Sequence, residues 1–189
     1  MKKIIFAVFM LLSFNVAIAQ QADPEEKSKS VTLEFMKKDG ACFKKEFYDL
    51  GNVKGVNCEV LIVTDIVQGT KIGCLRLKTK YYSSVSSDTY IGTLDFYEID
   101  ACVKSLEYIK SELQNQPSVY TEFEYKTNDG IKMGAYYDSG DKKKLPKWVA
   151  YVYTKGYTSR SAEFLDSSNI DSFVTIFKDA KKMIEEKVN

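Results

Sequence analysis

The sequence contains no histidine. Histidine is the commonest general base near neutral pH and the commonest metal ligand. Its absence excludes Ser-His-Asp catalysis, Cys-His catalysis and zinc sites with histidine ligands. Phosphate-binding loops, dinucleotide-binding glycine patterns and nucleophile elbows are also absent. Catalysis by carboxylates, lysine or tyrosine stays open, so an enzyme is disfavoured without being excluded, and we expect no cofactor.

Proline and paired cysteines are scarce as well. With three prolines and no low-complexity tract, the chain is not expected to contain long disordered segments. The four cysteines form no C-x-x-C pair, which argues against a zinc ribbon or a thioredoxin-like site. They either form one or two disulfides in an oxidising compartment or fill the core as small hydrophobic side chains. These cysteines are Cys42, Cys58, Cys74 and Cys102.

One long apolar run opens the chain. Two lysines precede the apolar residues 4–12, and Ala17-Ile18-Ala19 supplies small residues two positions apart. This order is typical of a secretory signal peptide. The run is too short to span a bilayer, which takes ~20 apolar residues. We therefore predict a signal peptide at 1–19, cleavage after Ala19, and a periplasmic or secreted mature protein without a transmembrane anchor.

The charge balance is close to neutral. The full chain has a net charge of +1, and removal of a signal peptide that carries two lysines and no acid would make it −1. Such a chain lacks the basic excess that neutralises phosphates, so a nucleic-acid partner is disfavoured. Residues 20–30 are polar and charged, and we expect a flexible leader there.

An internal repeat is the strongest signal in the mature chain. Ile99-Asp100 follows Leu94-Asp95 at the same spacing as Ile170-Asp171 follows Leu165-Asp166, and the offset is 71. Apolar residues then recur at i, i+3, i+4 and i+7 in both copies, which predicts two amphipathic helices. Cys102 matches the apolar Phe173, and we expect Cys102 to lie in the core.

Upstream segments also correspond, at offsets of about 90. Glu34-Phe35 matches Glu124-Tyr125, and Tyr48-Asp49 matches Tyr137-Asp138. The fall in offset from about 90 to 71 predicts extra residues in the first copy, around 68–88, where a serine-rich stretch indicates an exposed loop.

These patterns predict an α+β fold. It would consist of two tandem antiparallel β-meander-plus-helix repeats, at 31–114 and 119–187, packed as one pseudo-twofold domain over 31–187. Strands are expected at 31–37, 41–48, 58–67, 72–81 and 89–97 in the first repeat, and at 119–127, 131–138, 147–154 and 158–165 in the second. The helices are expected at 99–114 and 168–187.

Tyrosine is abundant, with 13 copies, many of them in the second repeat. Alternation along the strand at 147–154 places Trp148, Ala150 and Val152 on one face and the tyrosines on the other. An exposed tyrosine face would make a flat surface suited to stacking against a glycan, a peptide or a protein partner. Packing of these rings inside the protein is the interpretation that strand aromatics favour. The candidate ligand surface consists of Tyr136, Tyr151, Tyr153 and Tyr157.

Acidic residues gather near the predicted helix starts. Asp171 follows Ser168 at a spacing close to that of a capping box, so we interpret Asp171 and its repeat mate Asp100 as helix-start acids rather than a two-carboxylate site. The acids do not follow the spacing of a calcium-binding EF-hand loop, and no metal site is expected. A hydrolase would have to draw its carboxylates from Asp95, Glu98, Asp138 and Asp166.

The segment Leu94 to Asp100, with the apolar residues that follow it, resembles a strand-to-helix segment of small uncharacterised exported bacterial proteins. The signal peptide ending in Ala19 resembles those of Bacteroidetes-type exports. Four strands plus one helix, repeated, is also similar to the topology of Whirly-type single-stranded nucleic-acid binders. Neither resemblance implies an activity or a site residue for this chain.

Three functions follow as hypotheses. The leading one is an exported non-catalytic binding or structural module, with a glycan or a protein as its partner. The alternatives are an exported hydrolase that uses carboxylates, with two acids ~5–9.5 Å apart, and a single-stranded nucleic-acid binder whose affinity falls steeply with salt.

Overall fold

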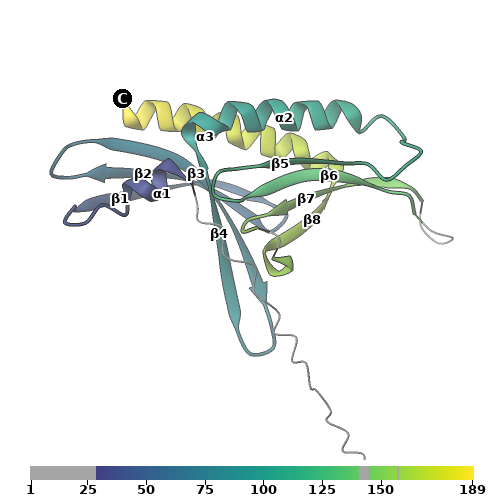
Figure 1. Ribbon diagram of the computed structural model, residues 1–189, viewed down its shortest axis with the longest axis horizontal. Helices are drawn as coiled ribbons and strands as arrows, with labels where there is room; N and C mark the ends of the chain where they lie inside the picture. The colour runs from purple at the N-terminus through teal and green to yellow at the C-terminus, as the bar shows by residue number, and fades with distance from the viewer. Residues whose placement is uncertain (1–28, 141–144, 157) are drawn as a thin grey trace, which may run out of the picture.

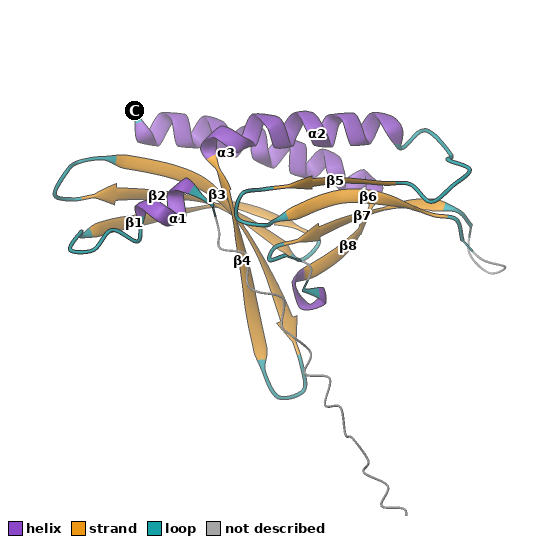
Figure 2. Ribbon diagram, viewed as in Figure 1, coloured by secondary structure: helices purple, strands orange, loops and turns teal. Residues whose placement is uncertain are grey.

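The computed structural model describes residues 29–140, 145–156 and 158–189. The predicted signal peptide and the predicted leader up to residue 28 lie outside the described residues. The described part is an α+β fold of two four-stranded antiparallel sheets and two long helices that pack together, as the sequence predicts (Figures 1 and 2). None of its helices is long and apolar enough to cross a bilayer.

Both sheets are simple meanders. In each, every strand pairs antiparallel with the next strand in the chain. The first sheet contains β1 (Phe43–Val53), β2 (Val56–Asp65), β3 (Lys71–Tyr82) and β4 (Ser87–Asp95). The second sheet contains β5 (Glu122–Lys126), β6 (Lys132–Asp138), β7 (Lys147–Tyr153) and β8 (Ala162–Asp166).

The strand-to-helix junctions confirm the repeat at an offset of 71. Strand β4 ends at Asp95 and is followed by the 3-10 turn η1 (Phe96–Glu98) and helix α2 (Ile99–Glu112). Strand β8 ends at Asp166 and is followed by η3 (Ser167–Asn169) and α3 (Ile170–Val188). Cys102 and its repeat mate Phe173 are both buried, so Cys102 is a core position as predicted.

Each long helix covers the sheet of the other repeat. Helix α3 packs on β1, β2 and β3, while α2 packs on β5 and β6. A methyl carbon of Ile184 in α3 lies only 2.6 Å from where a side chain on Gly73 of β3 would begin, so glycine is needed there. The ring of Tyr108 in α2 meets the ring of Phe123 in β5 edge to face at 6.0 Å. The two helices also pack against each other above both sheets, and one core joins the two repeats (Figure 1).

The segment predicted as a strand at 31–37 is instead the short helix α1 (Val31–Phe35). Ser30 caps this helix by accepting the Leu33 N–H at 3.2 Å. Phe35 then packs, with Met36, on the face of the first sheet opposite α3. The predicted match of Glu34-Phe35 with Glu124-Tyr125 is therefore wrong, because Tyr125 lies in β5.

The other upstream match and the predicted insertion are also wrong. Tyr48-Asp49 lies within the first strand of its sheet, whereas Tyr137-Asp138 ends the second strand of the other sheet. The extra length is spread over the first sheet, whose strands have 11, 10, 12 and 9 residues against 5, 7, 7 and 5 in the second. The serine-rich stretch does form an exposed turn, which the Ser83 N–H closes on the Ser86 carbonyl at 2.8 Å. This turn ends a β3–β4 hairpin that projects from the body of the protein (Figure 1).

Candidate functional site

Strand β7 has one face toward the helices and one away from them. Trp148, Ala150 and Val152 belong to the buried cluster that also contains the inner faces of α2 and α3. Tyr151 and Tyr153 therefore lie on the opposite face of the sheet, because side chains alternate along a strand. The predicted division of β7 into a core face and a tyrosine face is correct.

Four rings from three strands meet on this outer face. Tyr136 in β6 lies 6.3 Å from Tyr151 and 6.4 Å from Phe164, measured between ring centroids. Tyr153 lies 5.6 Å from Tyr151 and 6.2 Å from Phe164 of β8. Most of these contacts are edge to face, the geometry that aromatic pairs prefer. We call Tyr136, Tyr151, Tyr153 and Phe164 the aromatic patch.

Tyr151 is the centre of the aromatic patch and is 3% exposed. It lies opposite Gly134, where a side chain would begin only 2.9 Å from its hydroxyl oxygen. Its hydroxyl donates to Glu122 at 2.8 Å and lies 3.3 Å from a Glu124 oxygen. Burial, reinforced by the Glu122 hydrogen bond, raises the pKa of this phenol well above its ordinary value. Tyr151 thus supports its neighbours rather than offering an open ring.

Phe164 is the open ring of the aromatic patch, with 56% of its surface exposed. Tyr136 and Tyr153 are half-buried beside it. Sequence reasoning missed Phe164, although it pairs directly with Tyr151 across β7 and β8. The predicted surface residue Tyr157 lies outside the described residues.

Carboxylates border the aromatic patch along β5. The Tyr120 hydroxyl donates to Glu122 at 2.8 Å, and this hydrogen bond raises the pKa of Tyr120 to about 12. The amine of Lys132, itself buried, lies 3.7 Å from Glu124. At the opposite border, the exposed Asp166 shares a cross-strand row with Tyr136. Ring faces for stacking therefore lie beside oxygen atoms that accept hydrogen bonds.

The candidate hydrolase acids are divided between two places. Asp95 and Glu98 are buried where β4 meets α2, and Asp138 and Asp166 lie at strand ends of the second sheet. Asp138 accepts the Gly140 N–H at 3.0 Å.

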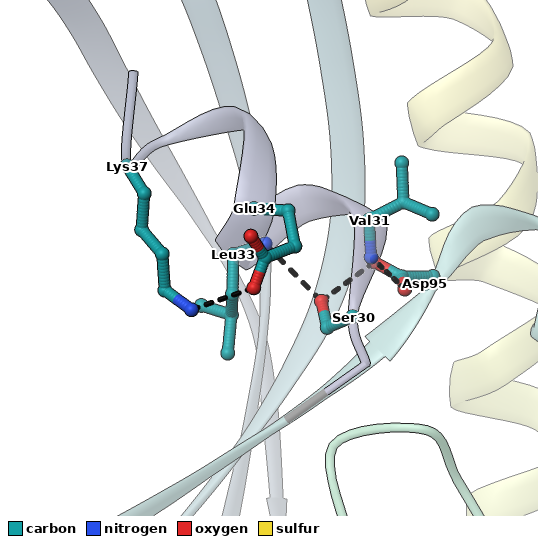
Figure 3. A network of polar contacts seen from close by, with 6 residues as sticks. All are labelled: Ser30, Val31, Leu33, Glu34, Lys37 and Asp95. Carbon is teal, nitrogen blue, oxygen red and sulfur yellow. Dashed lines mark hydrogen bonds and ion pairs between the residues drawn. The ribbon is translucent and has the colours of Figure 1, made fainter. Parts of the chain in front are cut away.

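Both buried acids are engaged by the protein itself. Asp95 accepts the Val31 N–H at 2.8 Å and the Ser30 hydroxyl at 3.0 Å (Figure 3). It also accepts the Thr32 N–H at 3.1 Å, and so it fixes the start of α1. Glu98 accepts the N–H groups of Asp95 at 3.0 Å and Asn128 at 2.8 Å. Burial raises the pKa of Glu98 above its ordinary value. These contacts join three parts of the chain.

All four cysteines are free thiols in the structure. Cys58, Cys74 and Cys102 are buried, as the packing interpretation predicts, and Cys42 is exposed. Burial raises the pKa of Cys58 and of Cys74 to about 12 and the pKa of Cys102 further. Cys58 and Cys74 belong to separate clusters on the two faces of the first sheet, so these two thiols do not face each other.

One open hollow of about 320 Å³ lies between α2 and β5, and Lys104, Ser105, Tyr108, Ile109, Phe123 and Glu124 line it. No group of three or more Cys, Asp or Glu side chains in the described part of the chain is placed to hold a metal ion.

Comparison of the chain with protein-family models, with curated proteins and with solved structures finds no match. The resemblance to small exported bacterial proteins therefore stays a prediction, and the functional argument depends on the geometry of the aromatic patch.

Proposed function

We propose that this protein is an exported, non-catalytic binding module, and that the aromatic patch on the second sheet binds a carbohydrate. A single observation supports the proposal: the open ring of Phe164 and the half-buried ring of Tyr136 lie 6.4 Å apart on a sheet face bordered by carboxylates. A sugar ring has an apolar face of C–H groups that stacks on such rings and hydroxyl groups around its rim that donate to carboxylates.

The positions of the acids fit this ligand. Glu122 and Asp166 occupy the two ends of the cross-strand row that contains Tyr136, and both are exposed. A flat saccharide lying along this row would meet the Tyr136 ring and Val149 in the middle, and acceptors at both ends. Phe164 stands in the neighbouring row, opposite Tyr151. The rigid sheet and the buried Tyr151 hold this surface in place before a ligand arrives, which lowers the entropic cost of binding.

The test is a glycan array, followed by calorimetry, with the full mature chain. We expect Phe164→Ala and Tyr136→Ala each to weaken binding about 3- to 10-fold, the size of one aromatic contact. Tyr82→Ala is the matched control, because it removes an exposed ring from the β3–β4 hairpin. Binding that is unchanged in both patch variants would contradict the proposal.

The non-catalytic part of the proposal needs its own measurement. Release of reducing ends from a bound glycan would contradict the non-catalytic proposal and favour the hydrolase alternative. Loss of that activity in Asp166→Asn would identify Asp166 as the catalytic carboxylate. Retention of single-stranded DNA at low salt would favour the nucleic-acid alternative. Both alternatives stay predictions.

A further inference from the structure

Strand β1 has one open edge. Ten of its 11 residues pair with β2 on one side, and Leu50 is left out where the register shifts between Asp49 and Gly51. No strand in the described part of the chain pairs with the other side. The edge strands of the second sheet, β5 and β8, have only five residues each. A long edge strand is a template for pairing with another chain.

The hydrogen-bond pattern shows which backbone groups of β1 point to this edge. The Ile66 N–H donates to the Cys42 carbonyl at 2.9 Å, just before the first paired residues of β1 and β2. Hydrogen-bonded and non-hydrogen-bonded pairs alternate in an antiparallel ladder. The even-numbered residues from Lys44 to Tyr48 therefore bond to β2, and Lys45 and Phe47 direct their N–H and C=O groups outward.

The side chains on this edge form a self-complementary row. Phe47 is 52% exposed, and the exposed Lys45 and Asp49 stand two residues before and two residues after it on the same face. Lys45 makes no ion pair with any residue that the structure describes. Asp49 uses one oxygen to accept the Gly51 N–H at 3.1 Å, which leaves the other oxygen for a partner.

We infer that a second copy of this chain pairs with β1, antiparallel, about a twofold axis that passes through Phe47. In this register Phe47 lies opposite Phe47 of the second copy. Lys45 lies opposite Asp49 of the second copy, and the twofold axis repeats that pair on the other side. Two four-stranded sheets become one continuous eight-stranded sheet, and the interface is isologous. This surface is on the first sheet and is independent of the carbohydrate proposal.

Neighbouring registers lack this complementarity. A shift by two residues places Lys45 opposite Phe47, and a shift by four places Lys45 opposite itself. A shift by one residue turns the side chains to the wrong face. The Arg76 guanidinium also lies 5.1 Å from the centre of the Phe47 ring and is fixed by Glu59 at 2.9 Å, so the ring is oriented before pairing. The charges thus select one register and disfavour unspecific edge aggregation.

Sedimentation equilibrium in low salt tests the charge pairs. We expect Asp49→Lys and Lys45→Asp each to weaken dimerisation about tenfold or more, because each replaces two attractions with two repulsions. The double variant Lys45→Asp/Asp49→Lys restores the charge pairs, so its dimer dissociation constant should be within about threefold of that of the wild type. Glu186→Lys and Lys182→Asp, exposed on α3, are the matched charge controls. A wild-type chain that is monomeric at every concentration would overturn the inference, as would equal dimerisation by all variants.

Cross-linking tests the position of the axis. In a Cys42→Ser background, Phe47→Cys should be joined to a dimer by a short bismaleimide, because opposite residues of an antiparallel pair lie about 5 Å apart. Lys45→Cys places the two thiols about 13 Å apart, four residues along the strand, and Thr89→Cys places them on β4, so both should react far more slowly. Equal cross-linking at the three positions would contradict the proposed register even if the protein is a dimer.

Discussion

Glu107 in α2 and Lys178 in α3 form an ion pair of 2.7 Å, and the two residues are related by the repeat offset of 71. Each is therefore the other's mate in the repeat. A residue that contacts its own repeat mate lies on the axis that relates the two copies, so the pseudo-twofold axis passes between these two side chains.

Two further ion pairs flank the axis symmetrically. Lys110 meets Asp171 at 2.5 Å, and Lys181 meets Asp100 at 2.5 Å. The offset of 71 converts one pair into the other. Asp100 and Asp171 do stand in the first turns of their helices, as predicted, and each also holds the antiparallel neighbour helix.

Exchange of the axial charges is the first prediction. Glu107→Lys should lower the free energy of unfolding by about 0.5 kcal/mol, because both side chains are about half exposed and water screens the pair. The double variant Glu107→Lys/Lys178→Glu should recover wild-type stability, since the swap rebuilds the pair on the axis. Urea unfolding of the four proteins gives the coupling energy, and a double variant no more stable than the single one would argue against this geometry.

The strand-to-helix junctions could be predicted from the sequence. The packing of each long helix on the sheet of the other repeat could not. The match of Leu94-Asp95 with Leu165-Asp166 preserves residue identities at fixed spacing, so both junctions can be located. An amphipathic stripe shows only that one face of a helix is buried and does not say which sheet covers it. The prediction of a strand in place of α1 was wrong for a related reason. The intrinsic propensity of this segment favours a strand, and the Asp95 carboxylate that fixes the first turn of the helix is more than 60 residues away in the sequence.

The candidate site was predicted in part. Alternation along β7 separated Tyr151 and Tyr153 from the face that contains Trp148, but it left open whether the tyrosine face is exposed or packed. The burial of Tyr151 depends on Gly134 in the neighbouring strand and on the β5 carboxylates, which only the strand register brings together. Phe164 was missed because its pairing with Tyr151 is likewise a property of the register.

Asp95→Asn is the second prediction, with Asp166→Asn as its matched control. Asp95 is 1% exposed and accepts three hydrogen bonds at the start of α1, whereas Asp166, its repeat mate, is exposed. We expect Asp95→Asn to cost about 2–3 kcal/mol of unfolding free energy and Asp166→Asn less than about 0.5 kcal/mol. Limited proteolysis should also cleave near Val31 faster in Asp95→Asn alone. Equal losses in both variants would show that Asp95 does not anchor α1.

The pH dependence of Glu98→Gln is the third prediction. Burial raises the pKa of Glu98 above its ordinary value of 4.5, so the folded state holds this proton more tightly than the unfolded state. The unfolding free energy of the wild type should therefore fall, relative to that of Glu98→Gln, as pH rises from 4.5 to the raised pKa, and then stay constant. Urea unfolding of both proteins at half-unit steps from pH 4 to 8 isolates this difference. A gap that does not change with pH would mean that the Glu98 pKa is the same in both states.

Reaction with Ellman's reagent is the fourth prediction and tests whether the thiols are free. Cys42 is exposed and should react at once in the native protein, whereas Cys58, Cys74 and Cys102 are buried and should react only on unfolding. Burial raises the pKa of Cys58 and Cys74 to about 12, so their thiolate fraction near pH 8 is small as well. The native protein should give one fast thiol and the denatured protein four. A Cys42→Ser variant should give no fast thiol in the native protein and three thiols after denaturation. Fewer than four thiols in the denatured wild type would contradict the prediction, because they would demonstrate a disulfide.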